Sequence, residues 1–278
     1  MENKVYLNGE YLPLSEAKIS VLDRGFLFGD GVYEVIPSYA GQLFKLQEHL
    51  QRLEASLGVI KLDFSYSLSQ WLEILTPLLN AEKDQYIYLQ ITRGVSAKRD
   101  HAFPHDATPT VFAMCSDIKL TTGVEKGIKA LTMEDSRWEL CHVKATTLLA
   151  NVLLRQEAIE QGCGEAILHR QGSVTEGAAS NLFAVINGVL MTPKKTAGIL
   201  PGITRQVILE LAKNNDIPHQ EDIISLAALQ SASEIWVTSS TREIIPVVEL
   251  DAVKVGEGVP GPVWKRMSQL FQEYKRAI

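Results

Sequence analysis

The 278-residue sequence lacks several features that mark special classes of protein. Its three cysteines, Cys115, Cys141 and Cys163, are odd in number and show no Cys-x-x-Cys spacing, so we expect reduced thiols and no zinc site. No apolar run approaches the ~18 residues of a transmembrane helix, and the first residues have no basic start and apolar core typical of a signal peptide. The sequence therefore predicts a cytoplasmic protein without a membrane partner.

An excess of positive charge is also absent. The chain has 27 Lys and Arg against 33 Asp and Glu, which gives a formal net charge of -6. Nucleic acids and anionic membranes select a basic face, so we expect neither as a partner. With 46% hydrophobic and 22% charged residues, the composition is that of an ordinary globular protein, long enough for two domains.

Motifs for nucleotide binding and for nucleophilic or metal chemistry are missing as well. Gly25, Gly29 and Gly31 are followed by no Gly-Lys-Ser/Thr, and no helix is expected after the last of them, which disfavours a phosphate loop. His142 has no serine or cysteine nucleophile at a recognised spacing, and we assign it a structural role. No metal ligand is predicted.

The remaining pattern mixes strands and amphipathic helices, which predicts an α/β fold of two domains, 1–118 and 123–278. Residues 116–123 are expected to connect them. Strands are predicted at 5–12, as a hairpin around Asn8-Gly9, and at 85–92, 110–115, 127–133, 166–169, 182–186 and 234–238. Helices are predicted at 44–57, 67–81, 145–161, after Pro201-Gly202, and at 263–277. The helix at 145–161 is expected to use Leu149, Leu153 and Ala158 as core positions.

Chemistry is concentrated around one carboxylate and one lysine. Glu176 lies near a predicted strand end among small residues, an arrangement that in isolation is most often only a tight strand connection. Thirty-two residues upstream, Lys144 stands just ahead of a long helical pattern. Pyridoxal phosphate enzymes need such a pair, because a lysine amine forms a Schiff base with the cofactor and a carboxylate keeps the pyridine nitrogen protonated.

The motifs around these residues resemble those of the fold-type IV aminotransferases, which include D-amino-acid and branched-chain aminotransferases and aminodeoxychorismate lyase. They are Lys144 with Leu148 and Asn151, then Ala166-Ile-Leu, Val174-Thr-Glu-Gly and Ser180-Asn-Leu-Phe. The resemblance runs from about Tyr6 to Leu250. It implies a pyridoxal phosphate enzyme of two domains, assembled as a homodimer, whose larger C-terminal domain carries the lysine.

The resemblance also implies a role for particular residues. Lys144 would bind the cofactor covalently and move protons, Glu176 would face the pyridine nitrogen, and Tyr33 would form part of the pocket wall. The phosphate would be held by Arg52, Ile203, Thr204, Ser239 and Ser240. Without the resemblance, Arg52 would be interpreted as a solvated helix residue pointing away from the apolar stripe, and Ile203 as the start of a simply capped helix.

One loop favours a D-amino-acid substrate. Arg99-Asp-His101 matches the R-x-H loop of the D-amino-acid aminotransferases, in which the two side chains grip the substrate carboxylate. The implied reaction links D-alanine and D-glutamate with 2-oxoglutarate and pyruvate. The alternatives are a branched-chain L-amino-acid aminotransferase, a lyase of the same fold, and a binding domain without activity. Three departures from the family pattern, Pro37, Ala178 and Ala179, leave the side-chain preference open.

Overall fold

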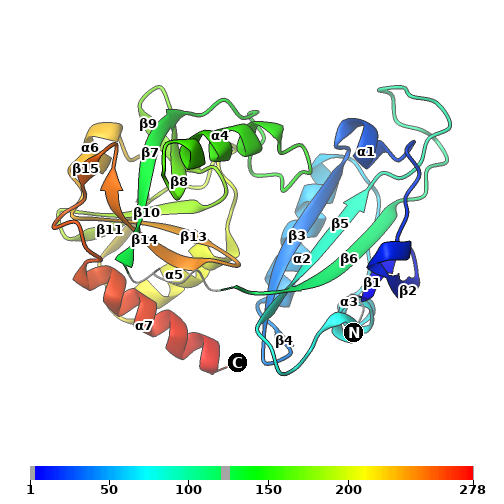
Figure 1. Ribbon diagram of the computed structural model, residues 1–278, viewed down its shortest axis with the longest axis horizontal. Coiled ribbons are helices and arrows are strands. Elements are labelled where there is room, and N and C mark those ends of the chain that lie inside the picture. The colour runs from blue at the N-terminus through cyan, green and yellow to red at the C-terminus, as the bar shows by residue number, and fades with distance from the viewer. Residues whose placement is uncertain (1–3, 120–125, 278) are drawn as a thin grey trace. The chain divides into compact units, whose positions relative to one another are not determined.

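The computed structural model describes residues 4–119 and 126–277 (Figure 1). Its internal contacts divide the chain into two compact units. Unit 1 contains residues 4–119 together with Val143–Leu148, and unit 2 contains residues 126–142 and 149–277. Part of the predicted connection at 116–123, from residue 120 onward, lies outside the described residues.

Within residues 4–119, six strands form one antiparallel sheet in the order β2-β1-β6-β5-β3-β4. They are β1 (Lys4–Leu7), β2 (Glu10–Pro13), β3 (Gly31–Tyr39), β4 (Gln42–Leu43), β5 (Gln85–Thr92) and β6 (Thr110–Asp117). The predicted β1–β2 hairpin is present, because Asn8 and Gly9 adopt the positive φ angles of 49° and 100° that a tight turn needs.

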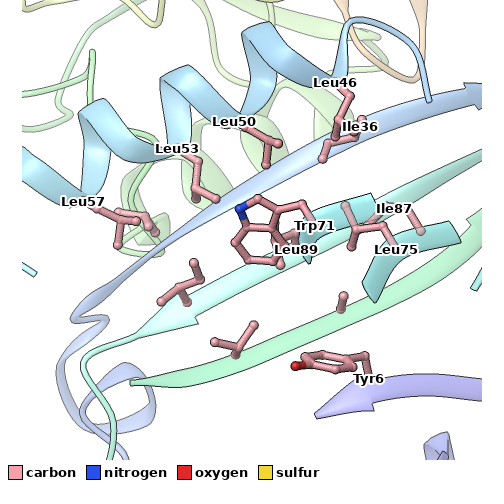
Figure 2. Packing of buried hydrophobic residues seen from close by; sticks show 14 of the residues in the cluster. Tyr6, Ile36, Leu46, Leu50, Leu53, Leu57, Trp71, Leu75, Ile87 and Leu89 are labelled. Atoms are coloured by element: carbon pink, nitrogen blue, oxygen red, sulfur yellow. The ribbon is translucent and has the colours of Figure 1, made fainter. Parts of the chain in front are cut away.

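Two helices, α2 (Leu46–Val59) and α3 (Leu68–Leu75), cover one face of this sheet and form its core (Figures 1 and 2). The predicted leucine stripe of α2 packs toward Ile36, Ile87 and Leu89 of the strands, as Figure 2 shows. The stripe consists of Leu46, Leu50, Leu53 and Leu57. Instead of continuing to residue 81, α3 passes into a 3-10 turn, Thr76–Leu78, because Pro77 cannot extend the helix.

Two features of unit 1 differ from the prediction. The glycine-rich segment after residue 23 contains a short helix, α1 (Arg24–Phe28), which Asp23 caps by accepting from the backbone N of Gly25 at 2.7 Å. A second 3-10 turn, η1, covers Leu14–Glu16. Tight capping and the small size of Gly25 explain a helix that glycine spacing alone does not indicate.

The lysine segment also belongs to unit 1, whereas the sequence placed it in the C-terminal domain. Val143–Leu148 runs beside β3: the backbone N of Tyr33 donates to the Lys144 carbonyl at 2.9 Å, and the N of Thr146 donates to the Gly31 carbonyl at 3.0 Å. These bonds fill the edge of β3 that β5 leaves open. They are also the reason why the following helix begins at residue 149 and not at 145.

In residues 126–277, nine strands form a mixed sheet in the order β12-β11-β10-β13-β14-β7-β8-β9, with β15 paired to β14. The pairs β7–β8, β7–β14 and β11–β12 are parallel. The strands are β7 (Ile128–Glu134), β8 (Glu165–Arg170), β9 (Ser173–Gly177), β10 (Asn181–Ile186), β11 (Val189–Pro193), β12 (His219–Asp222), β13 (Glu234–Ser239), β14 (Glu243–Leu250) and β15 (Val253–Lys254).

The helices of unit 2 are α4 (Leu149–Glu160), α5 (Ile203–Asn214), α6 (Leu226–Gln230) and α7 (Pro262–Arg276). Of the three core positions predicted for α4, Ala158 is confirmed and Leu149 and Leu153 are wrong. Leu149 and Leu153 are 72% and 61% exposed, while Leu154 and Ala158 pack toward β8. Among the residues that the structure describes, no helix combines the length and the apolar character needed to cross a bilayer.

Candidate active site

The residues singled out from the sequence are divided between the two units. Unit 1 holds Tyr33, Arg52, Arg99, His101 and Lys144. Unit 2 holds Glu176, Ile203, Thr204, Ser239 and Ser240.

Lys144 is fixed by its backbone and leaves its side chain half-buried. Its backbone N donates to Oγ of Ser56 at 3.2 Å, and its carbonyl accepts from Tyr33. The Nζ atom lies 4.3 Å from the centroid of the Tyr33 ring, within cation–π distance. The first predicted pair of site residues in unit 1 is therefore in direct contact.

Arg52 is buried, which excludes the alternative interpretation of a solvated helix residue. Its Nε and Nη2 donate to the two oxygens of Glu34 at 2.7 and 2.8 Å, and Nδ1 of His49 lies 2.7 Å from the same carboxylate. Complete burial opposes ionisation of Glu34, but the Arg52 and His49 contacts outweigh it and hold the pKa of Glu34 well below its usual range. The bidentate pair therefore fixes the plane of the guanidinium.

The helix brings Arg52 and the lysine segment to the same side of unit 1. Ser56, which binds the Lys144 backbone, is four residues after Arg52 and so lies on the same face of α2. Desolvation by burial lowers the pKa of His49, and the positive charges of Arg52 and Lys144 act in the same direction. The charge and hydrogen bond of Glu34 act in the opposite direction, but the net pKa of the imidazole stays below its ordinary value.

Arg99 and His101 share an apolar support on the loop between β5 and β6. The guanidinium carbon of Arg99 is 5.0 Å from the centroid of the Phe28 ring, and the His101 ring centroid is 5.3 Å from it. Both side chains are exposed. The structure thus brings together the two residues that the R-x-H spacing singled out.

Glu176 is 3% exposed and receives hydrogen bonds from three directions. Arg137 Nη1 donates to Oε1 at 2.6 Å, Asn181 Nδ2 donates to Oε2 at 2.9 Å, and the backbone N of Leu200 lies 3.2 and 3.1 Å from the two oxygens. All of these partners are donors, so the pocket of the carboxylate is built for a negative charge.

A chain of charges supports this carboxylate. Arg137 also binds Asp135, with Nε and Nη2 each 2.9 Å from a carboxylate oxygen, and Arg170 Nε lies 3.2 Å from Asp135. Desolvation raises the pKa of Glu176 to about 7, against the opposing effect of Arg137. A further cation beside Glu176 would lower that pKa again, and the site is therefore suited to a group that carries a proton on nitrogen.

The sequence reasoning missed Asp135, Arg137, Asn181 and Leu200. Arg137 is 39 residues away from Glu176 in the chain, and only the fold brings the two together. The sequence contained one indication of this ion pair, because Asp135 and Arg137 directly follow strand β7.

Next to this carboxylate, the start of α5 has the geometry of an anion site. Its N-cap, Gly202, provides no side-chain cap to the first turn at Ile203 and Thr204. A Cβ at Gly202 would lie 1.9 Å from Oδ1 of Asn181, so only glycine allows this approach. Because Asn181 also binds Glu176, the acid and the helix N-terminus are held by one amide.

Ser239 and Ser240 lie at the adjacent strand end. Asn181 pairs with Thr238 across β10 and β13, which brings Ser239 close to the same edge. Oγ of Ser239 accepts from the backbone N of Arg242 at 3.3 Å. The half-buried serines and the start of α5 are therefore brought to one end of the unit 2 sheet.

Trp138 and the three departures from the family pattern differ in exposure. Trp138 is 43% exposed. Ala178 is buried and accepts through its carbonyl from Asn151 at 2.8 Å, whereas Ala179 is exposed in the turn that follows Gly177. On β3, Pro37 is buried and Val35 is half-buried. Both lie on the face of the strand that carries Tyr33, because alternate residues of a strand point to the same side.

Unit 1 contains a lysine against an aromatic ring, and unit 2 contains a donor-lined buried carboxylate beside an uncapped helix start. The chain belongs to the class IV aminotransferases: the family model Amino-transferase class IV matches residues 31–250.

Individual relatives agree with this assignment along the whole chain. A D-alanine aminotransferase from Staphylococcus haemolyticus is 40% identical over 275 residues, covering 98% of this chain and 97% of that protein. The structure is similar to that of the Escherichia coli branched-chain amino acid aminotransferase, with a TM-score of 0.90 and 29% identity. The match covers 98% of this chain and 94% of that chain. The branched-chain aminotransferase of Thermoproteus uzoniensis, solved with norvaline, has a TM-score of 0.89 at 27% identity. The match covers 98% of this chain and 94% of that chain.

Proposed function

We propose that the protein is a pyridoxal phosphate-dependent D-amino-acid aminotransferase. It would transfer the amino group of D-alanine or D-glutamate to 2-oxoglutarate or pyruvate. The observation that carries the proposal is Glu176, a buried carboxylate that accepts from Arg137, Asn181 and the backbone N of Leu200, with a helix N-terminus beside it. The similarity to D-alanine aminotransferases supports the choice of substrate.

The residues of each unit fit different parts of the cofactor. Glu176 would accept the hydrogen bond of the protonated pyridine nitrogen, and the positive charge of that ring would lower the pKa of Glu176 from about 7 and keep the carboxylate ionised. The backbone of Ile203 and Thr204, with Ser239 and Ser240, suits the phosphate. Arg52, oriented by Glu34, would add a charge-assisted contact to that phosphate.

Lys144 would act first as a nucleophile and then as a base and acid. The cofactor, when bound, supplies an electron sink for the bonds at the substrate Cα. The Nζ atom of Lys144 would accept the proton released from the substrate Cα and donate it again later in the transfer. Tyr33, whose ring lies 4.3 Å from Nζ, would limit the directions in which the amine can move.

Arg99 and His101 would bind the carboxylate that every amino-acid substrate carries. A charge-assisted, two-sided contact fixes the orientation of the substrate, which converts binding energy into rate. The branched-chain aminotransferases are similar in structure and represent the second candidate function. The Arg99 and His101 pair favours the D-amino-acid enzyme, because branched-chain members and the lyase do not usually carry it.

The proposal includes a homodimer in the cytoplasm. Leu149, Val152 and Leu153 form an apolar face of α4 that is 58% to 72% exposed in the single chain. A second copy of the chain would cover this face and complete the carboxylate site. Sedimentation at assay concentrations should give twice the 30.8 kDa chain mass. A fully active monomer would contradict the dimer.

Replacing Glu176 by glutamine separates cofactor binding from proton transfer. Wild-type protein reconstituted with pyridoxal phosphate should show a visible absorption band that borohydride removes. Glu176→Gln should retain the cofactor but remove the Cα proton about 10- to 150-fold more slowly, because a neutral amide does not stabilise the pyridinium. Stopped-flow spectroscopy with D-alanine measures this rate.

Glu257→Gln, which removes a carboxylate from an exposed position, is the control and should behave as the wild type. A deprotonation rate in Glu176→Gln equal to that of the control would exclude the role of Glu176. Absence of a borohydride-sensitive band in the wild type would refute the proposed cofactor altogether.

A further inference from the structure

A buried arginine at the start of α1 binds the backbone of the loop that carries Arg99 and His101. Arg24 is 3% exposed. Its Nη1 donates to the carbonyl oxygens of Asp100 at 2.6 Å and Ala102 at 3.2 Å, and its Nη2 donates to that of His101 at 3.3 Å. Three consecutive carbonyls therefore converge on one guanidinium, whose rigid planar fork specifies the path of the loop.

A shared carboxylate holds Arg24 in place. Oδ2 of Asp30 accepts from Nε of Arg24 at 2.7 Å and from Nε of Arg93 at 2.8 Å. Arg93 also donates to the carbonyls of Ile60 and Lys61, at 2.7 and 3.1 Å, at the end of α2. Burial opposes ionisation of Asp30, but the bonds from Arg93 and Arg24 prevail and lower its pKa. These contacts connect the loop to the core of unit 1.

The same arrangement directs the two exposed side chains. With the loop carbonyls bound to Arg24, Arg99 and His101 both lie against Phe28, the last residue of α1. The guanidinium carbon of Arg24 is itself 4.9 Å from the centroid of the Phe28 ring. One short helix thus provides both the donor for the loop backbone and the surface that supports its side chains.

We propose that Arg24 is a positioning residue for the carboxylate of the amino-acid and 2-oxo-acid substrates. It touches the loop and not the substrate, and acts by holding Arg99 and His101 in a binding arrangement before the substrate arrives. Ordering two exposed side chains costs free energy at the moment of binding, and a prearranged backbone reduces that cost. The proposal rests on the proposed function, in which Arg99 and His101 bind the carboxylate.

Hydrogen exchange of the holoenzyme tests the effect on the loop without reference to any substrate. In Arg24→Met, peptides containing residues 99–103 should exchange about tenfold faster or more, because the three carbonyl contacts are lost. Arg24→Lys keeps a charge beside Asp30, but a single Nζ cannot replace one Nε and two Nη atoms. It should therefore show the same increase. Arg266→Met, on the surface of α7, is the control.

Steady-state kinetics test the effect on the substrate. Both Arg24 variants should raise the KM for D-alanine about tenfold with little change in kcat, and leave the turnover of amines without a carboxylate unchanged. In an Arg99→Ala background, Arg24→Met should raise KM less than it does in the wild type, because part of its action passes through Arg99. If Arg24→Met does not fold, Arg24→Lys carries the same measurements.

Three results would overturn the role of Arg24. They are unchanged exchange at 99–103 in both variants, full recovery of exchange and KM in Arg24→Lys, and effects of Arg24→Met and Arg99→Ala that simply add. A wild-type enzyme that does not use D-alanine would instead refute the proposed function, while the exchange measurement would still decide whether Arg24 orders the loop.

Discussion

Lys144→Ala should lower the transamination of D-alanine by at least about a thousandfold, because one amine supplies both the nucleophile and the proton carrier. Single-turnover absorption measurements with D-alanine check this directly, since they follow conversion of the cofactor to its amine form. Borohydride should no longer attach the cofactor to the protein. Near-wild-type conversion by Lys144→Ala would refute the assignment of this lysine.

The fold should survive the substitution. The side chain of Lys144 contacts the Tyr33 ring, an interaction worth about 0.5 to 1 kcal/mol at an exposed site, and its backbone bonds remain in the alanine variant. Circular dichroism and thermal unfolding should therefore resemble those of the wild type. Lys265→Ala, an exposed position on α7, is the matched control and should keep full activity.

Arg99→Ala should reduce kcat/KM for D-alanine about 10- to 150-fold, the loss expected for a charge-assisted contact of roughly 1.5 to 3 kcal/mol. The loss should appear with every D-amino acid, because all of them carry the carboxylate, and should be small for amines that lack one. His101→Ala should follow the same pattern more weakly. The bound cofactor should keep its absorption and affinity in both variants.

The neighbouring Lys98 provides a sharp control for this prediction. It is also an exposed cation on the same loop, so Lys98→Ala removes an equal charge without removing the proposed contact. If both variants lose activity equally, the effect is one of overall loop charge and not of carboxylate binding. Unchanged kinetics in Arg99→Ala would contradict the role of Arg99.

Local patterns predicted the local structure well. The leucine stripe identified α2, the Asn8-Gly9 pair identified the first hairpin, and β5 has the predicted bounds of Gln85–Thr92. Each of these depends on residues close together in the chain. In α4 the prediction was right for Ala158 and wrong for Leu149 and Leu153, because leucines stand on more than one face of the helix and only the packing on β8 decides which face is buried.

The hydrogen-bond partners of the site residues lie far from them in the sequence. Glu176 was identified from its motif, but its donor Arg137 lies on a different segment and was missed. Without the resemblance, Arg52 would be interpreted as a surface residue, because periodicity within α2 contains no information about Glu34 on β3. A buried charge is stable only with its partner, and the identity of the partner follows from the fold and not from spacing.

The central claim, that this class IV aminotransferase acts on D-amino acids, is tested most directly by comparing D-alanine with L-leucine and L-isoleucine as amino donors to 2-oxoglutarate. The purified protein with pyridoxal phosphate should form pyruvate and D-glutamate from D-alanine, with a higher kcat/KM than for either L-amino acid. A preference for L-leucine or L-isoleucine would contradict the account and assign the protein to the branched-chain enzymes.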